Sequence, residues 1–174
     1  MRKRGFEVVK RLEDKKDDII LPKRSTKNSA GYDFFAYEDV IIPSILPDFL
    51  KFKRDLITGG QVLELGRIKP VIVKTGIKAY MQEDEVLYLF NRSSNPGKLG
   101  LVLVNGTGVI DADYYGNEDN DGEICFALYN IFPINIKINK GDKIGQGVFQ
   151  HFLKIDNDKV DVERKGGFGS TGNN

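Results

Sequence analysis

Short apolar and β-branched segments recur along the whole chain and are separated by Gly, Pro, Asn and Asp. They occupy residues 6–9, 18–21, 71–77, 86–90, 99–104, 123–130, 134–138 and 144–152. Segments this short are typical of strands, and the residues between them favour turns. Helical periodicity is scarce. The best helix candidate covers 47–56, where Phe49, Phe52 and Leu56 would share one face. The pattern therefore predicts an all-β barrel or sandwich.

A chain of 174 residues is long enough for one domain with its own core. We expect a single β-barrel domain over residues 1–162, followed by a flexible Gly-rich C-terminal arm over 163–174. Residues 44–69 are loosely patterned and are interpreted as an insertion into the barrel. Residues 117–122 are polar enough to form an exposed loop, and 139–142 have the composition of a tight turn between strands.

Charge and composition exclude several classes of protein. The 26 basic and 25 acidic residues nearly cancel, so we expect no nucleic-acid partner, and no apolar run approaches the length of a membrane span. The single cysteine, Cys125, forms no internal disulfide, which suits a cytoplasmic location, and it is expected to be a buried small hydrophobe. His151 is the only histidine, which rules out a histidine-rich zinc site, and it is expected in a strand. Any chemistry must therefore use carboxylates, hydroxyls, cations and an external metal ion.

The segment 164–172 reads Arg-Lys-Gly-Gly-Phe-Gly-Ser-Thr-Gly. Glycines let backbone N–H groups approach an anion closely, and the hydroxyls and cations add further donors. The exposed ring of Phe168 could lie over a flat base. The composition favours an arm that closes on a nucleotide, and the alternative is an ordinary frayed chain end.

Two further polar segments come earlier in the chain. Asp33 ends the sequence Ser-Ala-Gly-Tyr-Asp at 29–33, where it could orient waters around a metal or simply cap a turn. The segment 92–98, Arg-Ser-Ser-Asn-Pro-Gly-Lys, combines cations, hydroxyls and free amides, and is a candidate anion nest or an ordinary polar turn.

Two more segments follow. Asn105 and Gly106 predict a sharp hairpin turn, whose backbone donors and acceptors could read the edge of a base. Asp111 and Asp113 would face the same side of an extended strand and could provide a general base, or they could form a solvated acidic turn. In the last segment, 141–146, every position except Gln146 is explained by structure alone.

Taken together, these segments resemble the trimeric dUTP diphosphatase (dUTPase) family. The five family motifs are found, in the family's order, at residues 30–33, 92–100, 108–116, 141–146 and 164–172. One such motif would be weak evidence, but five in order over nearly the whole chain are specific.

The resemblance implies a fold, an assembly and an activity. The fold would be a distorted jelly-roll barrel in a homotrimer, with the C-terminal arm exchanged between subunits and active sites shared. The activity would be hydrolysis of dUTP to dUMP and pyrophosphate with Mg²⁺. The metal would be held by triphosphate oxygens and waters, with no direct protein ligand and with Asp33 in the outer shell.

The resemblance also implies roles for individual residues. Asp111 would deprotonate the attacking water, and Tyr114 would pack against the deoxyribose and exclude a 2′-hydroxyl. Asn105 and the backbone around it would read uracil, and Phe168 would cover it. The residues expected to contact substrate are Arg92, Ser93, Ser94, Asn105, Gly108, Val109, Ile110, Tyr114, Gln146, Arg164, Phe168, Gly169, Ser170 and Thr171. Among them, Arg92, Ser93, Ser94 and Gln146 would hold the phosphates, and Arg164, Ser170 and Thr171 would close on the γ-phosphate.

The chain departs from the family pattern at three positions and is longer at two. Tyr115 replaces a common Arg or Gln, Asn117 stands near a usual Glu, and Asn91 precedes the Arg-Ser-Ser turn where proline is frequent. The insertions at 44–69 and 117–122 could cover a trimer surface or bind a partner, and decoration is the favoured interpretation.

Two alternative functions stay open at this point. A dCTP deaminase shares the β architecture and the Arg-Ser-Ser turn, although the complete arm and the segment 111–114 favour the diphosphatase. A nucleotide-binding regulatory trimer without turnover is the alternative from another class.

Overall fold

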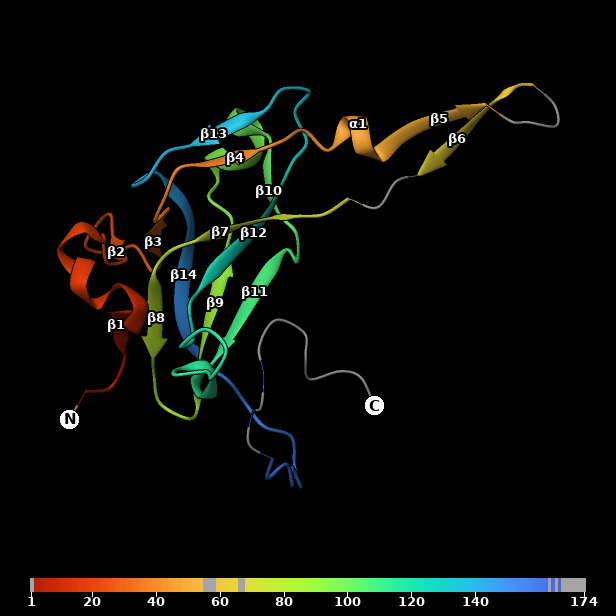
Figure 1. Ribbon diagram of the computed structural model, residues 1–174. Coiled ribbons are helices and arrows are strands. Elements are labelled where there is room, and N and C mark those ends of the chain that lie inside the picture. The colour runs from red at the N-terminus through yellow and green to blue at the C-terminus, as the bar shows by residue number, and fades with distance from the viewer. Residues whose placement is uncertain (1, 55–58, 66–67, 163, 165, 167–174) are drawn as a thin grey trace.

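The computed structural model describes residues 2–54, 59–65, 68–162, 164 and 166, and strands dominate this part of the chain (Figure 1). The strands are β1 Gly5–Val8, β2 Lys23–Arg24, β3 Tyr32–Phe35, β4 Val40–Ile42, β5 Leu50–Arg54, β6 Gln61–Leu65, β7 Val71–Lys74, β8 Ile77–Tyr80, β9 Glu85–Phe90, β10 Leu101–Leu103, β11 Thr107–Asp111, β12 Cys125–Asn130, β13 Ile136–Ile138 and β14 Lys143–His151. The helical segments are η1 Lys10–Asp18, α1 Leu46–Phe49, η2 Asn95–Leu99 and η3 Ala112–Tyr114. The all-β prediction is confirmed.

Two sheets enclose the core. The larger has the strand order β11-β9-β14-β3-β2, and the smaller has the order β10-β12-β7. The pairs β1-β8, β13-β4 and β5-β6 complete the described strands. All ladders between named strands are antiparallel, as expected for strands joined by short turns.

The core lies between these sheets because strands from both present alternating apolar side chains inward. Along β12, Phe126 and Leu128 are buried while the residues between them are partly exposed, which is the period of a strand with one face covered. The rings of Phe34 and Phe126 lie 5.6 Å apart and join the two sheets. A Cβ at Gly145 would stand 2.0 Å from the Phe126 ring, so only glycine fits this position in β14.

The predicted turn at 139–142 is confirmed, since the Asp142 N–H donates to the Asn139 carbonyl over 3.0 Å and Gly141 has φ +85°. The turn at Asn105 and Gly106 is also sharp, with Gly106 at φ +67°. The hairpin prediction is nevertheless wrong in one respect, because β10 pairs with β12 whereas β11 pairs with β9. The turn is a corner between two sheets, and an Asn-Gly turn alone does not choose the partners of the strands it joins.

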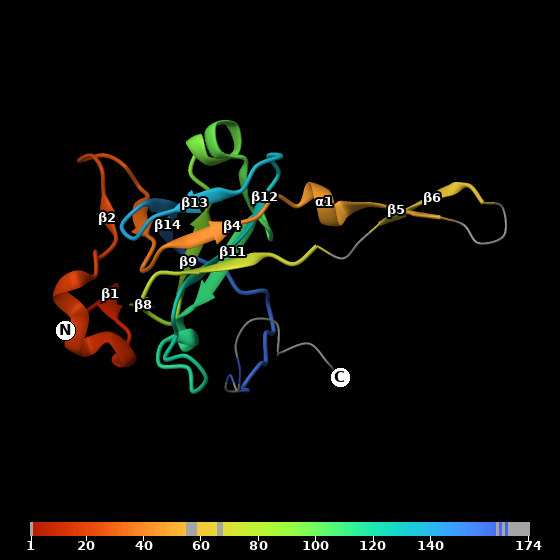
Figure 2. The same ribbon diagram turned by 45° about the horizontal axis from the view of Figure 1, so that its top comes forward.

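The insertion 44–69 forms α1 and the hairpin β5-β6, which extends away from the barrel (Figures 1 and 2). The predicted helix over 47–56 is wrong beyond Phe49, since Leu50–Arg54 is a strand paired with Gln61–Leu65. Its sequence, Leu-Lys-Phe-Lys-Arg, alternates apolar and charged residues, and this period of two suits a strand better than a helix.

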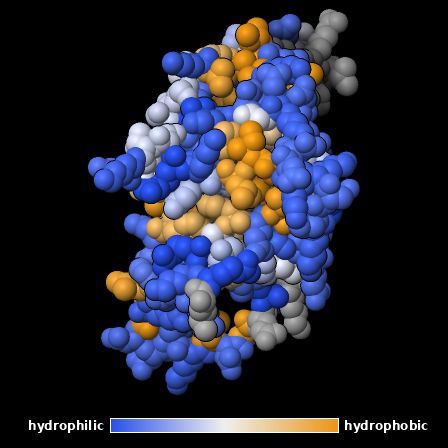
Figure 3. All heavy atoms as spheres, turned by 90° about the vertical axis from the view of Figure 1, so that its left-hand side faces the viewer, coloured by the Kyte–Doolittle hydropathy of each residue, from blue (hydrophilic) through white to orange (hydrophobic). Residues whose placement is uncertain are grey.

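The face that carries η1 and β2 is largely hydrophilic around a smaller apolar area (Figure 3). Ile20 and Leu21, which lie between these two elements, are 42% and 47% exposed. Within the described ranges, the helical segments are all too short or too polar to cross a membrane.

Candidate active site

A pocket of about 250 Å³ lies between β11, at one edge of the larger sheet, and the strands β10 and β12 of the smaller sheet. It is lined by Leu89, Leu103, Asn105, Gly108, Val109, Ile110, Asp111, Tyr114, Glu123, Cys125, Ala127 and Arg164. Six of the substrate contacts expected from sequence are in this set, and so is the expected general base: Asn105, Gly108, Val109, Ile110, Tyr114 and Arg164, with Asp111.

The strand β11 is positioned to offer its backbone to a ligand. In the described part of the chain it pairs only with β9, from Thr107 opposite Phe90 to Asp111 opposite Val86. The other edge of β11 therefore presents backbone N–H and C=O groups without a neighbouring strand. A Cβ at Gly108 would lie 3.0 Å from the Leu89 Cβ, so glycine there lets the ligand-facing strand lie close to β9.

Asp111 is the last residue of β11, and its carboxylate is 47% exposed at the pocket. The Arg164 guanidinium donates to the carboxylates of both Asp111 and Asp113, and its Nε lies 2.8 Å from Asp113 Oδ1. The expectation that the two aspartates share one face of an extended strand is wrong, because the strand ends at Asp111 and Asp113 belongs to the 3₁₀ turn η3. They come together through a shared cation instead.

Tyr114 closes one side of the pocket, and only 5% of it is exposed. Its hydroxyl donates to the Glu123 carbonyl over 3.3 Å and accepts from Asn120 Nδ2 over 2.7 Å. Burial raises the pKa of Tyr114, and the charge of Glu123 raises it further. The hydrogen bond from Asn120 acts in the opposite direction and is outweighed. The hydroxyl is therefore protonated at neutral pH, and it is held by one hydrogen-bond donor and one acceptor.

Cys125 also lines the pocket, so the prediction that it is simply a buried hydrophobe is incomplete. Burial and the neighbouring Glu123 raise the pKa of its thiol to about 12. The thiol is protonated at neutral pH and contributes a weakly polar surface to the pocket wall.

A second cluster forms where β3, β9 and β14 run side by side. The Lys143 ammonium lies 2.6 Å from the Asp33 carboxylate, which also accepts from the Ser25 hydroxyl over 2.7 Å. Arg92 Nη1 donates to the Lys143 carbonyl over 3.2 Å. Burial alone would raise the pKa of Asp33, but the hydrogen bonds from Lys143 and Ser25 and the charges of Lys143 and Arg92 outweigh it and lower the pKa.

The other expected phosphate contacts lie beside this second cluster. Gln146 stands opposite Asp33 in the ladder, and its Nε2 donates to the Asn91 carbonyl over 3.4 Å. A Cβ at Gly31 would lie 2.3 Å from Gln146 Oε1, so this glycine makes room for the glutamine side chain. Ser93 and Ser94 directly precede η2, and the Ser94 side chain makes no capping bond there.

The two clusters are separate within one chain. Asp111 stands opposite Val86 at the start of β9, whereas Gln146 stands opposite Phe90 at its end. This stretch of β9 spans roughly 13 Å, and Asp33 lies a further two strands across the sheet, roughly 10 Å. None of the residues of the second cluster lines the pocket. The expected contacts Phe168, Gly169, Ser170 and Thr171 lie outside the described residues.

Several residues of both clusters were missed from the sequence. Glu123 precedes β12, while Cys125 and Ala127 lie in it, and a period of two would have placed all three on one face of a strand. Nothing in the sequence indicated that this face adjoins β11. Ser25 and Lys143 reach Asp33 only through strand pairing of β2, β3 and β14, which no local motif encodes.

The charges around Asp33 suit phosphate better than a bare metal ion. Among the described residues, no group of three or more His, Cys, Asp or Glu side chains could hold a metal. Asp33 is instead bordered by Lys143 and Arg92. Mg²⁺ usually keeps several waters and is bound through one or two carboxylates together with substrate phosphates, and a single carboxylate beside two cations fits that mode.

The fold and the site define a β-barrel protein with an edge strand beside a pocket and a carboxylate at the end of that strand. A family model described as dUTPase matches residues 61–172. The chain is 47% identical to the deoxyuridine 5′-triphosphate nucleotidohydrolase of Lactococcus lactis subsp. lactis strain IL1403, over 99% of both chains. The chain belongs to the dUTPase family.

Solved structures agree with this assignment. The dUTPase from Streptococcus mutans is 41% identical, with a TM-score of 0.69 over 87% of this chain and 98% of that one. A mutant dUTPase from phage phi11 of S. aureus, in which a structural Mg(II) ion is coordinated, has a TM-score of 0.61 over 92% of this chain and 98% of that one. At 19% identity, the phage protein supports the fold alone.

The ion pair of Asp33 predicts how stability depends on pH. Because its pKa is lowered in the folded state, its contribution is present above the unfolded pKa, near 4, and is lost as pH falls through the lower folded value. We expect Lys143→Met to lower the free energy of unfolding by about 1 kcal/mol at pH 7, and by less at pH 3. Urea unfolding at both pH values measures this.

The control is Lys137→Met, which removes an exposed pair with Asp39 whose partners are 58% and 56% exposed. It should change stability very little at either pH. A loss in Lys143→Met that is the same at pH 3 and pH 7 would contradict the pKa assignment.

Proposed function

We propose that this protein is a dUTP diphosphatase that hydrolyses dUTP to dUMP and pyrophosphate by attack of water on the α-phosphorus. The observation that carries the proposal is the position of Asp111, at the end of an edge strand and at the rim of a pocket sized for a base and sugar. The matching relative from Lactococcus lactis is a nucleotidohydrolase rather than a deaminase, which favours attack on phosphorus over attack on a base ring.

Uracil would be read by the free edge of β11, from Gly108 to Ile110, together with Asn105. Backbone groups in a strand alternate donors and acceptors in fixed positions, so a base with the opposite pattern leaves buried groups unpaired. Cytosine would be rejected in this way, and thymine by a clash of its methyl group. The Tyr114 ring would pack on the deoxyribose and leave no room for a 2′-hydroxyl.

Asp111 would act as the general base. Its carboxylate takes a proton from a water molecule, the water oxygen bonds to the α-phosphorus, and the bridging oxygen leaves with pyrophosphate. Arg164 holds Asp111 and Asp113 in the chain without substrate. When dUTP binds, this arm residue would leave these carboxylates for the γ-phosphate in a neighbouring subunit's site, which frees Asp111 for the water.

The second cluster would hold the triphosphate. Arg92, Ser93 and Ser94 supply a guanidinium and two hydroxyls, and Gln146 adds an amide. Asp33 would orient waters in the outer shell of a Mg²⁺ ion held by the phosphate oxygens. When bound, the metal offsets phosphate charge and fixes the triphosphate for in-line attack.

We propose that the barrel comprises residues 1–162 and that 163–174 form the arm. Phe168 of the arm would cover the uracil, and Gly169, Ser170 and Thr171 would close on the phosphates. This closure excludes bulk water and strengthens the electrostatic contacts inside the site. The single free Cys125 is consistent with a cytoplasmic enzyme.

A homotrimer would unite the two clusters, which lie at opposite ends of β9 within one chain. The segment that leads to the arm also supports this assembly. Leu153, Ile155, Val160 and Val162 are 81–97% exposed in a single chain, and such apolar side chains are normally covered by a partner. One subunit would supply the pocket, a second the phosphate cluster and a third the arm.

Pyrophosphate release from dUTP, dCTP, dTTP and UTP, with and without Mg²⁺, tests the proposed activity. We expect release from dUTP that depends on Mg²⁺ and is reduced by a chelator, and at least a hundredfold preference over the other nucleotides, the scale expected when buried polar groups are left unpaired. Ammonia release from dCTP without pyrophosphate release from dUTP would contradict the proposal.

Asp111→Asn tests the general base. General-base assistance contributes roughly two to four orders of magnitude in rate, so we expect kcat to fall by that factor. Binding of dUMP, followed by calorimetry, should change little because the amide keeps the size of the carboxylate. Turnover near that of the wild type would remove Asp111 from this role.

Mixing two inactive variants tests whether the sites are shared. Asp111→Asn and Arg92→Ala subunits, denatured together and refolded, should regain about a quarter of the wild-type activity if the two residues come from different subunits of a random trimer. Asp111→Asn refolded with Asp111→Ala is the matched control and should stay inactive. Recovery equal to that control would show that each chain builds its own site.

A further inference from the structure

Residues 117–122 fold back tightly onto the segment that carries Tyr114. The Asn117 N–H donates to the Tyr114 carbonyl over 3.2 Å, and the Asp121 N–H donates to the Asn117 carbonyl over 2.7 Å. Gly122 has φ +80°, and a Cβ there would stand 2.4 Å from the Tyr114 carbonyl oxygen. A loop packed this closely supports the backbone of Tyr114, which lines the pocket.

Asn120 is the residue of this loop whose side chain reaches Tyr114. Its Nδ2 donates to the Tyr114 hydroxyl over 2.7 Å, while its Oδ1 accepts from the Gly122 N–H over 3.0 Å. The same hydroxyl donates to the Glu123 carbonyl over 3.3 Å. Tyr114 is therefore held by one donor and one acceptor, and Asn120 is in turn oriented by its own loop.

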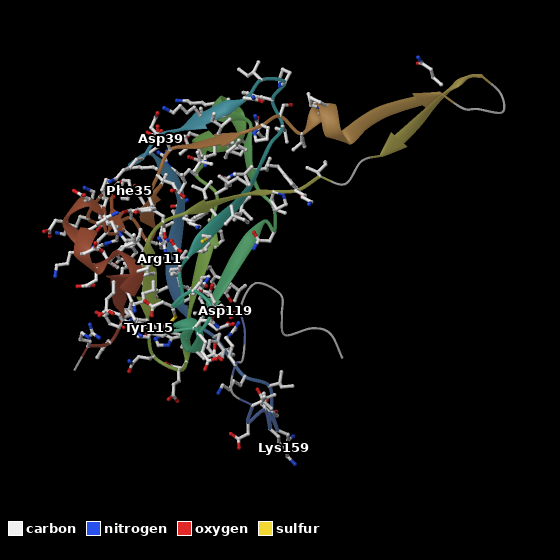
Figure 4. The ribbon with its side chains drawn as sticks, in the orientation of Figure 1. Arg11, Phe35, Asp39, Tyr115, Asp119 and Lys159 are labelled. Carbon is white, nitrogen blue, oxygen red and sulfur yellow. The ribbon has the colours of Figure 1, made fainter. Side chains whose placement is uncertain are left out.

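The base of the loop is tied to the barrel by charges. Asp121 accepts from the Lys78 ammonium over 2.7 Å and from the Lys10 N–H over 2.7 Å. Glu123, just beyond the loop, pairs with Arg11 over 2.6 Å. The Lys78 side chain is 6% exposed, so this contact is shielded from water and salt. Figure 4 places Tyr115 and Asp119 at this end of the barrel, below Phe35 and Asp39.

We propose that Asn120 is a positioning residue that fixes the Tyr114 ring and thereby sets the preference for a 2′-deoxyribose over a ribose. The proposal rests on the proposed function, in which this ring leaves no room for a 2′-hydroxyl. A ring held at both sides of its hydroxyl cannot tilt to admit the larger sugar. Without the Asn120 donor the ring keeps a single hydrogen bond, so the gap at the sugar widens.

The test uses Asn120→Asp and Asn120→Ala in the full chain, with kcat and KM measured for dUTP and UTP. Asn120→Asp keeps an oxygen for the Gly122 N–H but removes the donor to Tyr114, so it preserves the loop turn if Asn120→Ala does not fold. We expect the ratio of kcat/KM for dUTP to that for UTP to fall about fivefold in either variant, the change expected for one net hydrogen bond to a buried hydroxyl.

Two controls separate positioning from a general effect on the loop. Asp119→Ala alters an exposed neighbour whose backbone N–H makes the bond to Asn117 in this loop, and its dUTP/UTP ratio should match the wild type. In a Tyr114→Phe background, Asn120→Asp should leave the ratio unchanged, because the hydroxyl through which Asn120 acts is gone.

An unchanged ratio in both Asn120 variants of an active enzyme would overturn the positioning role alone. The positioning role would also be overturned if Asp119→Ala lowered the dUTP/UTP ratio as much as the Asn120 variants do. It would likewise be overturned if Asn120→Asp lowered the ratio further in the Tyr114→Phe background. A wild-type chain that releases no pyrophosphate from dUTP would overturn the proposed function and this inference with it.

Discussion

The one-sided pairing of β11 is the constraint on which the rest of the site depends. The corner at Asn105 sends β10 into the smaller sheet and β11 into the larger one, so β11 has β9 on one side and a pocket on the other. A free strand edge in most proteins is an aggregation hazard. In this protein the edge faces a pocket walled by the neighbouring sheet, and under the proposed function its donors and acceptors would read the base.

Charge is divided between the two ends of the larger sheet. The pocket end carries Asp111 and Asp113, and the other end carries Arg92 and Lys143 around Asp33. In the proposed mechanism a carboxylate activates water and cations bind phosphate, and these two sets of groups would neutralise one another if they were adjacent. Within one chain each set is paired locally instead, Asp111 with Arg164 and Lys143 with Asp33, and an assembly of several chains would bring both sets to one nucleotide.

Much of the fold and part of the site could be predicted from the sequence. Alternating apolar residues in segments such as 123–130 and 144–152 correctly predicted strands, and the glycines and asparagines between them predicted the turns. The grouping of Asn105, Asp111 and Tyr114 was also predicted, because these residues are close in sequence and one strand and one turn connect them. The helix over 47–56 was wrong, since three apolar residues at helical spacing could not outweigh the pairing of Leu50–Arg54 with Gln61–Leu65.

Residue chemistry and local conformation were thus determined by the sequence itself: short strands, sharp glycine turns, and the carboxylates, hydroxyls and cations available for catalysis. Only the tertiary structure decided that β12 supplies Cys125 and Ala127 to the pocket, that Lys143 neutralises Asp33, and that Asn120 holds Tyr114. The physical reason is that hydrogen bonds within a turn depend on neighbours in the chain, whereas partners across a sheet or a pocket are selected by packing of the whole core. Local patterns do not contain that information.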